Sequence, residues 1–110
     1  MGTAVAYQLL ISTCPDMSSA ETLAEMLLRE RLAACVNILP GARSLYIWQG
    51  ELQRDEEHVL LIKTREECLA ALQQALLAQH PYELPELIAV PIEHGSEAYL
   101  NWITQQVDKQ

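Results

Sequence analysis

Residues 33–50 read AACVNILPGARSLYIWQG, and this stretch decides the fold because it combines two extended segments with a kink between them and a tight turn after them. The extended segments are Cys35–Ile38 and Ser44–Trp48, and the second contains Tyr, Ile and Trp, which favour strands. Pro40 and Gly41 predict a bulge, since proline removes a donor from the ladder and glycine tolerates unusual dihedral angles. The stretch therefore predicts one long, kinked strand.

Gln49 and Gly50 follow that strand, where a tight hairpin turn is expected. A return strand is predicted from about Leu52 to Lys63, with Val59–Ile62 as its apolar part. The hairpin exceeds the usual strand length of about 3 to 10 residues, so we expect it to project beyond the body of the chain. Exposed strand edges pair readily with other chains, which predicts closed cyclic self-association.

The residues before the hairpin predict a strand followed by a helix. Val5–Ile11 is nearly continuously apolar, which is typical of a central strand covered on at least one face, and residues 14–16 (Cys-Pro-Asp) are expected to break it. Ser18 with Glu21 three residues later forms a capping-box pattern and predicts the helix start. Residues 20–32 then repeat alanine and leucine at spacings of three and four, so one face of the helix should pack.

The residues after the hairpin predict a helix, a strand and a last helix. Thr64 with Glu67 is a second capping-box pattern, and leucines recur at helical spacing over residues 69–76. Glu86–Ile92 has the composition of a fourth strand, and Ser96–Val107 that of a short final helix. The element order is therefore β, α, β, β, α, β and α.

That order predicts an α+β fold: a ferredoxin-like βαββαβ sandwich with a C-terminal helix, formed by residues 1–110 as a single domain. No linker-like or low-complexity stretch divides the chain. An antiparallel sheet with two helices on one face leaves its other face in need of a partner. The topology therefore also favours self-association.

The charge of the chain excludes one class of partner. With 110 residues, 7 basic and 15 acidic side chains and a net charge of −8, the protein cannot supply the basic groove that nucleic acid requires.

The sequence also predicts the compartment. No apolar run approaches the roughly 20 residues of a membrane span, and the N-terminal residues lack the basic flank of a secretory signal. Three widely spaced cysteines indicate reduced thiols rather than a disulfide framework. We expect a soluble cytoplasmic protein with no nucleic-acid or membrane partner.

The loop His80–Glu86 concentrates groups that could bind a ligand. It holds an imidazole (His80), a phenol (Tyr82) and two carboxylates (Glu83 and Glu86), and two prolines restrict its backbone. Imidazole and carboxylate are good ligands for Cu(II) or Zn(II), so the loop could hold a metal or a small ligand. The alternative is a structural turn with a histidine at the end of a helix, and the sequence leaves both interpretations open.

Three further side chains could take part in a site. Cys14, placed before Pro15 in a predicted loop, offers a soft ligand or redox group if it is exposed. Lys63 could position an anion or form a surface salt bridge. Trp48 is more typical of a core or interface anchor than of a stacking platform.

The sequence reveals no pair of nucleophile and base, because a catalytic triad is recognised by its spatial geometry and not by sequence position. We therefore expect a binding protein and not an enzyme. A hydrolase that uses His80 and Glu83 as acid and base is the enzymatic alternative.

Several motifs in this order closely resemble the CutA family of divalent cation tolerance proteins. They are AACVNILPG at 33–41, SLYIWQG at 44–50, KT at 63–64, HPYELPE at 80–86 and YLNW at 99–102. The resemblance spans nearly the whole chain. It implies a ferredoxin-like subunit in a tightly packed homotrimer, similar in architecture to the PII signalling proteins, with clefts between subunits.

The resemblance also implies that the protein binds copper or other divalent cations and responds to metal ions. Carried onto this chain, the metal region falls on His80 and Glu86. A cysteine after the first strand is associated with metal binding in some members; Ser12 aligns with it here, and the available thiol is Cys14. Cu(II) is the expected metal by the Irving–Williams order.

The expected ligand cleft between subunits uses Lys63, Tyr82, Glu83 and Trp48. The function that follows is divalent cation tolerance through metal binding in a trimeric cytoplasmic assembly. The alternative is a PII-like signalling or scaffold trimer whose clefts receive a small anion or a partner protein.

Overall fold

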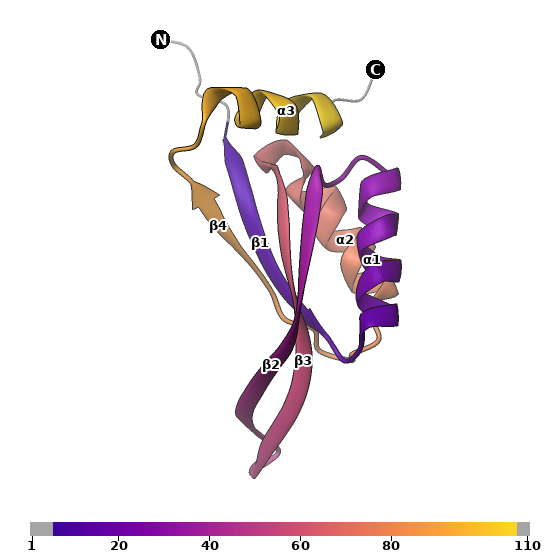
Figure 1. Ribbon diagram of the computed structural model, residues 1–110. Helices are drawn as coiled ribbons and strands as arrows, with labels where there is room; N and C mark the ends of the chain where they lie inside the picture. The colour runs from indigo at the N-terminus through magenta and orange to yellow at the C-terminus, as the bar shows by residue number, and fades with distance from the viewer. Residues whose placement is uncertain (1–5, 108–110) are drawn as a thin grey trace.

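The computed structural model describes residues 6–107, which form four strands and three α-helices (Figure 1). The order confirms the predicted βαββαβ pattern with an added C-terminal helix. None of the described helices is long and apolar enough to cross a membrane. The elements are β1 (Tyr7–Cys14), α1 (Met17–Arg29), β2 (Cys35–Trp48), β3 (Glu51–Arg65), a 3-10 turn (Glu66–Cys68), α2 (Leu69–Gln79), β4 (Leu87–Ile92) and α3 (Glu97–Val107).

The strands form one antiparallel sheet in the order β2-β3-β1-β4. Each helical connection, β1-α1-β2 and β3-α2-β4, skips one strand, and this is the arrangement of the ferredoxin-like fold. β4 lies at an edge, which allows Pro91 to sit in the strand without removing a donor from a central ladder.

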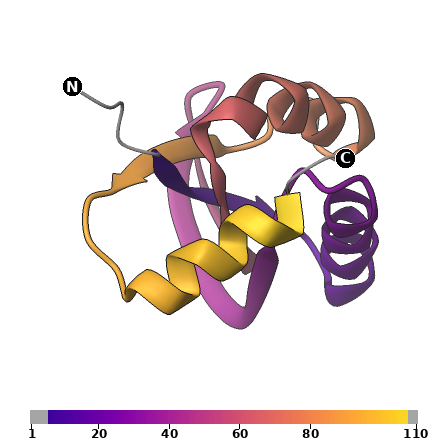
Figure 2. The ribbon, with the colours of Figure 1, turned by 90° about the horizontal axis from the view of Figure 1, so that it is seen from above.

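α1 and α2 pack on the same face of the sheet (Figures 1 and 2). Their leucines form one buried cluster with side chains of β1 and β3, including Leu10, Leu60 and Ile62. α3 crosses the end of the sheet, where Ile103 and Val107 close a second cluster with Tyr7 and others. The apolar faces of α1 and α2 therefore pack on the sheet, as their residue spacing predicted.

The hairpin of β2 and β3 projects from the body, as predicted (Figure 1). These strands have 14 and 15 residues, and the molecule measures 51 × 26 × 23 Å. Gln49 and Gly50 have φ of 50° and 82°, the positive values that a tight hairpin turn of this hand requires. Gly41 has φ of 84° beside a shift of register between Leu39 and Ala42, which confirms the bulge.

The face of the sheet opposite α1 and α2 is apolar. Successive strand residues point to opposite faces, so Leu9, Ile11 and Leu61 point away from the helices. In the register, Ile11 lies between Leu61 and Ile88, and Ile88 keeps 52% of its surface exposed. This face is the surface that self-association would cover.

The first strand ends later than predicted. Residues 12–14 continue β1, and Cys14 is not in a loop, because they stay paired with β3 as far as His58. At the other end of the predicted strand, Val5 lies outside the described residues. The sequence pattern missed this extension because it ended the strand where the apolar run became polar.

Both predicted capping boxes are wrong. Asp16, and not Ser18, caps α1: its Oδ1 accepts a hydrogen bond from the Ser19 amide at 2.7 Å. Thr64 belongs to β3, where its hydroxyl donates to the Leu32 carbonyl at 2.6 Å, and a 3-10 turn leads into α2. The cap of α1 thus lies two residues earlier than predicted, and the Thr64 hydroxyl is already engaged by another hydrogen bond.

The buried Thr64 bond ties the end of β3 to the segment after α1. Thr64→Val keeps the side-chain shape but leaves the Leu32 carbonyl without its donor, so we expect the free energy of unfolding to fall by about 1 to 3 kcal/mol. Urea denaturation measures it. Thr22→Val, on the exposed side of α1, is the matched control and should change stability little. Equal effects of the two substitutions would contradict the role of this bond.

Candidate functional site

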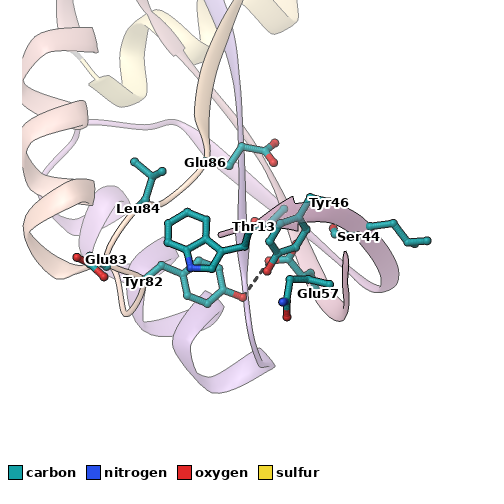
Figure 3. A pocket seen from close by; sticks show the side chains of 11 residues that line it. Thr13, Ser44, Tyr46, Glu57, Tyr82, Glu83, Leu84 and Glu86 are labelled. Carbon is teal, nitrogen blue, oxygen red and sulfur yellow. Dashed lines mark hydrogen bonds between the residues drawn. The ribbon is translucent and has the colours of Figure 1, made fainter. Parts of the chain in front are cut away.

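A cavity of about 650 Å³ lies between the projecting hairpin and the loop that joins α2 to β4 (Figure 3). The hairpin supplies one wall and the loop supplies the other, and Thr13 of β1 lies between them. The lining residues are Thr13, Ser44, Leu45, Tyr46, Trp48, Gln53, Glu57, Tyr82, Glu83, Leu84 and Glu86.

Strand alternation explains the hairpin wall. Ser44, Tyr46 and Trp48 are separated by two residues each and share one face of β2. On β3, Gln53 lies opposite Tyr46, and Glu57 follows at even spacing on the same face. The antiparallel register therefore brings two aromatic rings and a carboxylate together.

The loop wall is held on β1 by two side chains. The Ser12 hydroxyl donates to the Glu86 carbonyl at 2.7 Å, and His80 Nε2 lies 2.8 Å from the Thr13 carbonyl. The Tyr82 amide donates to His80 Nδ1 at 3.0 Å. A carbonyl can only accept and an amide can only donate, so Nε2 carries the ring proton and Nδ1 is the acceptor.

Tyr82 connects the loop with the hairpin. Its hydroxyl donates to Glu57 Oε2 at 2.9 Å, and the two groups point toward one another in Figure 3. Burial first, and then the hydrogen bond to Glu57, raises the pKa of the Tyr82 hydroxyl. The phenol therefore remains a protonated donor near neutral pH. Its ring also packs against His80, with 5.0 Å between centroids.

The electrostatic character of the cavity is acidic. Its lining includes the carboxylates of Glu57, Glu83 and Glu86, and within the described part of the chain no lysine, arginine or histidine lines it. Glu57 is only 7% exposed. A site of this composition attracts cations and repels anions.

His80 and Cys14 lie together in the interior of the subunit. Cys14 Sγ is 3.8 Å from His80 Nε2, and both side chains are buried. Both ring nitrogens of His80 already hold hydrogen bonds. Burial, with smaller effects from Asp16 and Glu57, raises the pKa of the Cys14 thiol to about 11, so it is not a thiolate at neutral pH. The arrangement matches the structural-turn interpretation of the loop.

The predicted metal set of His80, Glu86 and Cys14 is not assembled within one chain. Glu86 lines the cavity, to which neither His80 nor Cys14 contributes. Residues 6–107 contain no group of three histidine, cysteine or acidic side chains placed to hold one ion. A copper site built from these three residues stays a prediction that one subunit does not explain.

The predicted cleft residues divide between two places. Tyr82, Glu83 and Trp48 line the cavity, whereas Lys63 does not. The Lys63 ammonium donates to the side chain of Asn37 and lies 3.9 Å from Cys35 Sγ, farther along β3. Lys63 therefore lies on the sheet face opposite α1 and α2, away from the cavity.

Sequence reasoning missed Glu57 and Tyr46 as site residues. The available signal was the alternation of polar residues along the projecting strands, which places Gln53 and Glu57 on one face of β3. That signal identifies a shared face, but only the contact with Tyr82 shows which face lines a cavity.

Comparisons with known proteins agree with one another. The family model described as CutA1 divalent ion tolerance protein matches residues 8–106. A divalent-cation tolerance protein CutA of Thermus thermophilus is 44% identical over 98 residues, which cover 89% of this chain and 95% of that protein. The crystal structure of CutA from Xylella fastidiosa has a TM-score of 0.91 and 49% identity, with 93% of this chain and 98% of that chain covered. The crystal structure of CutA1 from Oryza sativa has a TM-score of 0.93 and 41% identity, with 99% of this chain and 100% of that chain covered.

The two hydrogen bonds of His80 predict a structural cost for its removal. His80→Ala leaves the Thr13 carbonyl and the Tyr82 amide without their partners, so the free energy of unfolding should fall by about 1 to 3 kcal/mol. His58→Ala is the control, because His58 Nδ1 has no hydrogen-bond partner within the described residues. Thermal or urea unfolding compares them, and a His80 variant as stable as the His58 variant would contradict this role.

Proposed function

The chain belongs to the CutA1 divalent ion tolerance family, and from that premise we propose that it is a homotrimeric protein that binds divalent cations at its acidic cavity. We propose a binding role without catalytic turnover. We also propose that it acts in the cytoplasm, because its three cysteines are all free, as is usual in reducing compartments.

The observation that carries this proposal is the acidic lining of the cavity. Glu83 and Glu86 come from the loop, and Glu57 comes from the hairpin. Carboxylate oxygens are ligands for divalent cations, and no basic side chain of the described residues opposes them there. A small anion, the ligand of the PII-like alternative, would be repelled by the same groups.

Cu(II) is the metal that we expect to bind most tightly, because affinity at nitrogen and oxygen ligands rises to copper along the first-row series. Glu83 and Glu86 would hold the ion. The remaining ligands would be water or groups of a neighbouring subunit, since neither His80 nor Cys14 lines this cavity.

The homotrimer is supported by apolar surface that one chain leaves uncovered. Ile88 and Val90 of the edge strand are 52% and 44% exposed, and they adjoin Ile11 and Leu9 in the register. Burying such a face against identical copies would remove it from water, and cyclic closure would leave no open end. The projecting hairpin adds an arm that can reach a neighbour (Figure 1).

Metal binding at the carboxylates is testable by native mass spectrometry with Cu(II), Zn(II) or Mg(II). We expect the protein to take up an integral number of Cu(II) ions per subunit. The double variant Glu83→Gln, Glu86→Gln should bind Cu(II) about tenfold more weakly, because contacts to charged groups are the strong ones. Glu97→Gln, on α3, removes a charge away from the cavity and should bind as the parent does. Undiminished binding by the double variant would contradict the proposal.

Assembly is testable through the uncovered face. Ile88→Lys places a charge on that face, so we expect the trimer to dissociate into monomers, as measured by light scattering after gel filtration. Leu77→Lys alters a similarly exposed leucine on α2, 43% exposed, and should leave the trimer intact. A trimeric Ile88 variant, or a monomeric parent protein, would contradict assembly through this face.

A further inference from the structure

We propose that Cys35 and Lys63 form an oxidation-sensitive pair, in which hydrogen peroxide converts the thiol and the amine into a covalent sulfur–nitrogen bond. This modification goes beyond the proposed binding of divalent cations and uses side chains away from the acidic cavity. It joins two strands of one subunit, so it depends on contacts within the chain and not on an open ligand site.

The backbone places the two side chains next to each other. Cys35 begins β2 and is the direct partner of Lys63 on β3 in the antiparallel register, and the Ala34 amide donates to the Lys63 carbonyl at 2.8 Å. Side chains of such cross-strand partners leave the same face of the sheet, with Cβ atoms about 4.5 to 5.5 Å apart. The Lys63 ammonium accordingly lies 3.9 Å from Cys35 Sγ. The sheet itself therefore holds the amine beside the sulfur.

Neighbouring side chains surround the pair. The Lys63 ammonium also donates to the side chain of Asn37, two residues along the same face of β2. Tyr99 of α3 adjoins the thiol: burial first, and then the neighbouring Cys35, raises the pKa of the Tyr99 hydroxyl. α3 crosses this end of the sheet, and the Tyr99 ring is held there by stacking on Trp102 (Figure 2). This setting leaves the Lys63 amine as the nearest nucleophile for an oxidised sulfur.

The other two cysteines lack such a partner. Lys63 is the only lysine of residues 6–107, so no second amine of this kind is available to them there. Cys14 is fully buried, and its pKa, raised to about 11, keeps it a thiol at neutral pH, whereas peroxide reacts with the thiolate. Cys68 is buried in the apolar cluster beneath α3. Cys35 is therefore the cysteine that we expect to react.

The chemistry balances with hydrogen peroxide as the only oxidant. The Cys35 sulfur attacks one peroxide oxygen: an S–O bond forms, the O–O bond breaks and water leaves, so sulfur is oxidised to the sulfenic acid and the peroxide is reduced. Lys63 then gives up a proton to water, and its neutral amine attacks the sulfenic sulfur. An N–S bond forms, the S–O bond breaks, and the leaving hydroxide takes a proton from the nitrogen and departs as water. The cross-linked subunit is lighter than the parent by two hydrogen atoms.

The position of the pair favours this trapping reaction. Both side chains lie on the sheet face opposite α1 and α2, which self-association would cover. Because both reacting groups belong to one subunit, the reaction requires no opening larger than a peroxide molecule, which is little larger than water. A covered face would also separate the sulfenic acid from larger thiols. The amine of the same subunit then reacts with it first.

Peptide mass spectrometry of the full-length, assembled protein tests the proposal after treatment with hydrogen peroxide in the presence of a chelator. We expect a cross-linked peptide that joins Cys35 to Lys63 and that is lost after reduction with dithiothreitol. Lys63→Arg keeps the positive charge but replaces the amine by a guanidinium that stays protonated. It should therefore lose the cross-link, and Cys35 should proceed to the sulfinic acid. Cys68→Ala leaves the pair intact and should form the cross-link as the parent does.

Each outcome decides the proposal. A Cys35 that stays unmodified in the assembled parent, or that is oxidised without the cross-link, would overturn it. Oxidation of Cys14 or Cys68 ahead of Cys35, or the same product in Lys63→Arg as in the parent, would do so as well. Native mass spectrometry shows whether each variant keeps the parent's assembly. Because the chelator removes metal throughout, a missing cross-link leaves the proposed cation binding untouched, and a failure to bind Cu(II) leaves this inference standing.

Discussion

The imidazole of His80 is the group on which the candidate site depends. It ends α2, reaches the Thr13 carbonyl of β1 with Nε2, and receives the Tyr82 amide at Nδ1. One ring thus fixes a helix end, a strand and a loop relative to one another. Both nitrogens have partners within the subunit that determine the tautomer, so the ring has a structural role.

The cavity follows from that constraint. With the loop fixed on β1, the Tyr82 hydroxyl meets Glu57 of the projecting hairpin, and the space between loop and hairpin closes on two sides (Figure 3). The side chains on the two walls are suited to binding cations. The loop contributes Glu83 and Glu86, and the hairpin contributes Tyr46 and other aromatic surface.

Local signals in the sequence predicted the fold well. Predicting the site would have required distances between residues far apart in the sequence, and no local pattern contains them. The turn at Gly50 and the bulge at Gly41 were predictable because positive φ angles favour glycine. The helix starts were not, because Asp16 and Thr64 form hydrogen bonds that compete with the capping pattern. The sequence of the loop around His80 left both a metal site and a structural turn open, since the choice depends on the Thr13 carbonyl, which is far away in sequence.

The central claim, that His80 is a structural group, is tested most directly by nitrogen NMR of histidine-labelled protein with and without Zn(II), which is diamagnetic. The geometry predicts that His80 is the Nε2-protonated tautomer and that its nitrogen shifts stay unchanged when Zn(II) is added. A His80 ring protonated at Nδ1, or a Zn(II)-dependent shift of either nitrogen, would contradict the claim and return His80 to the metal-binding residues.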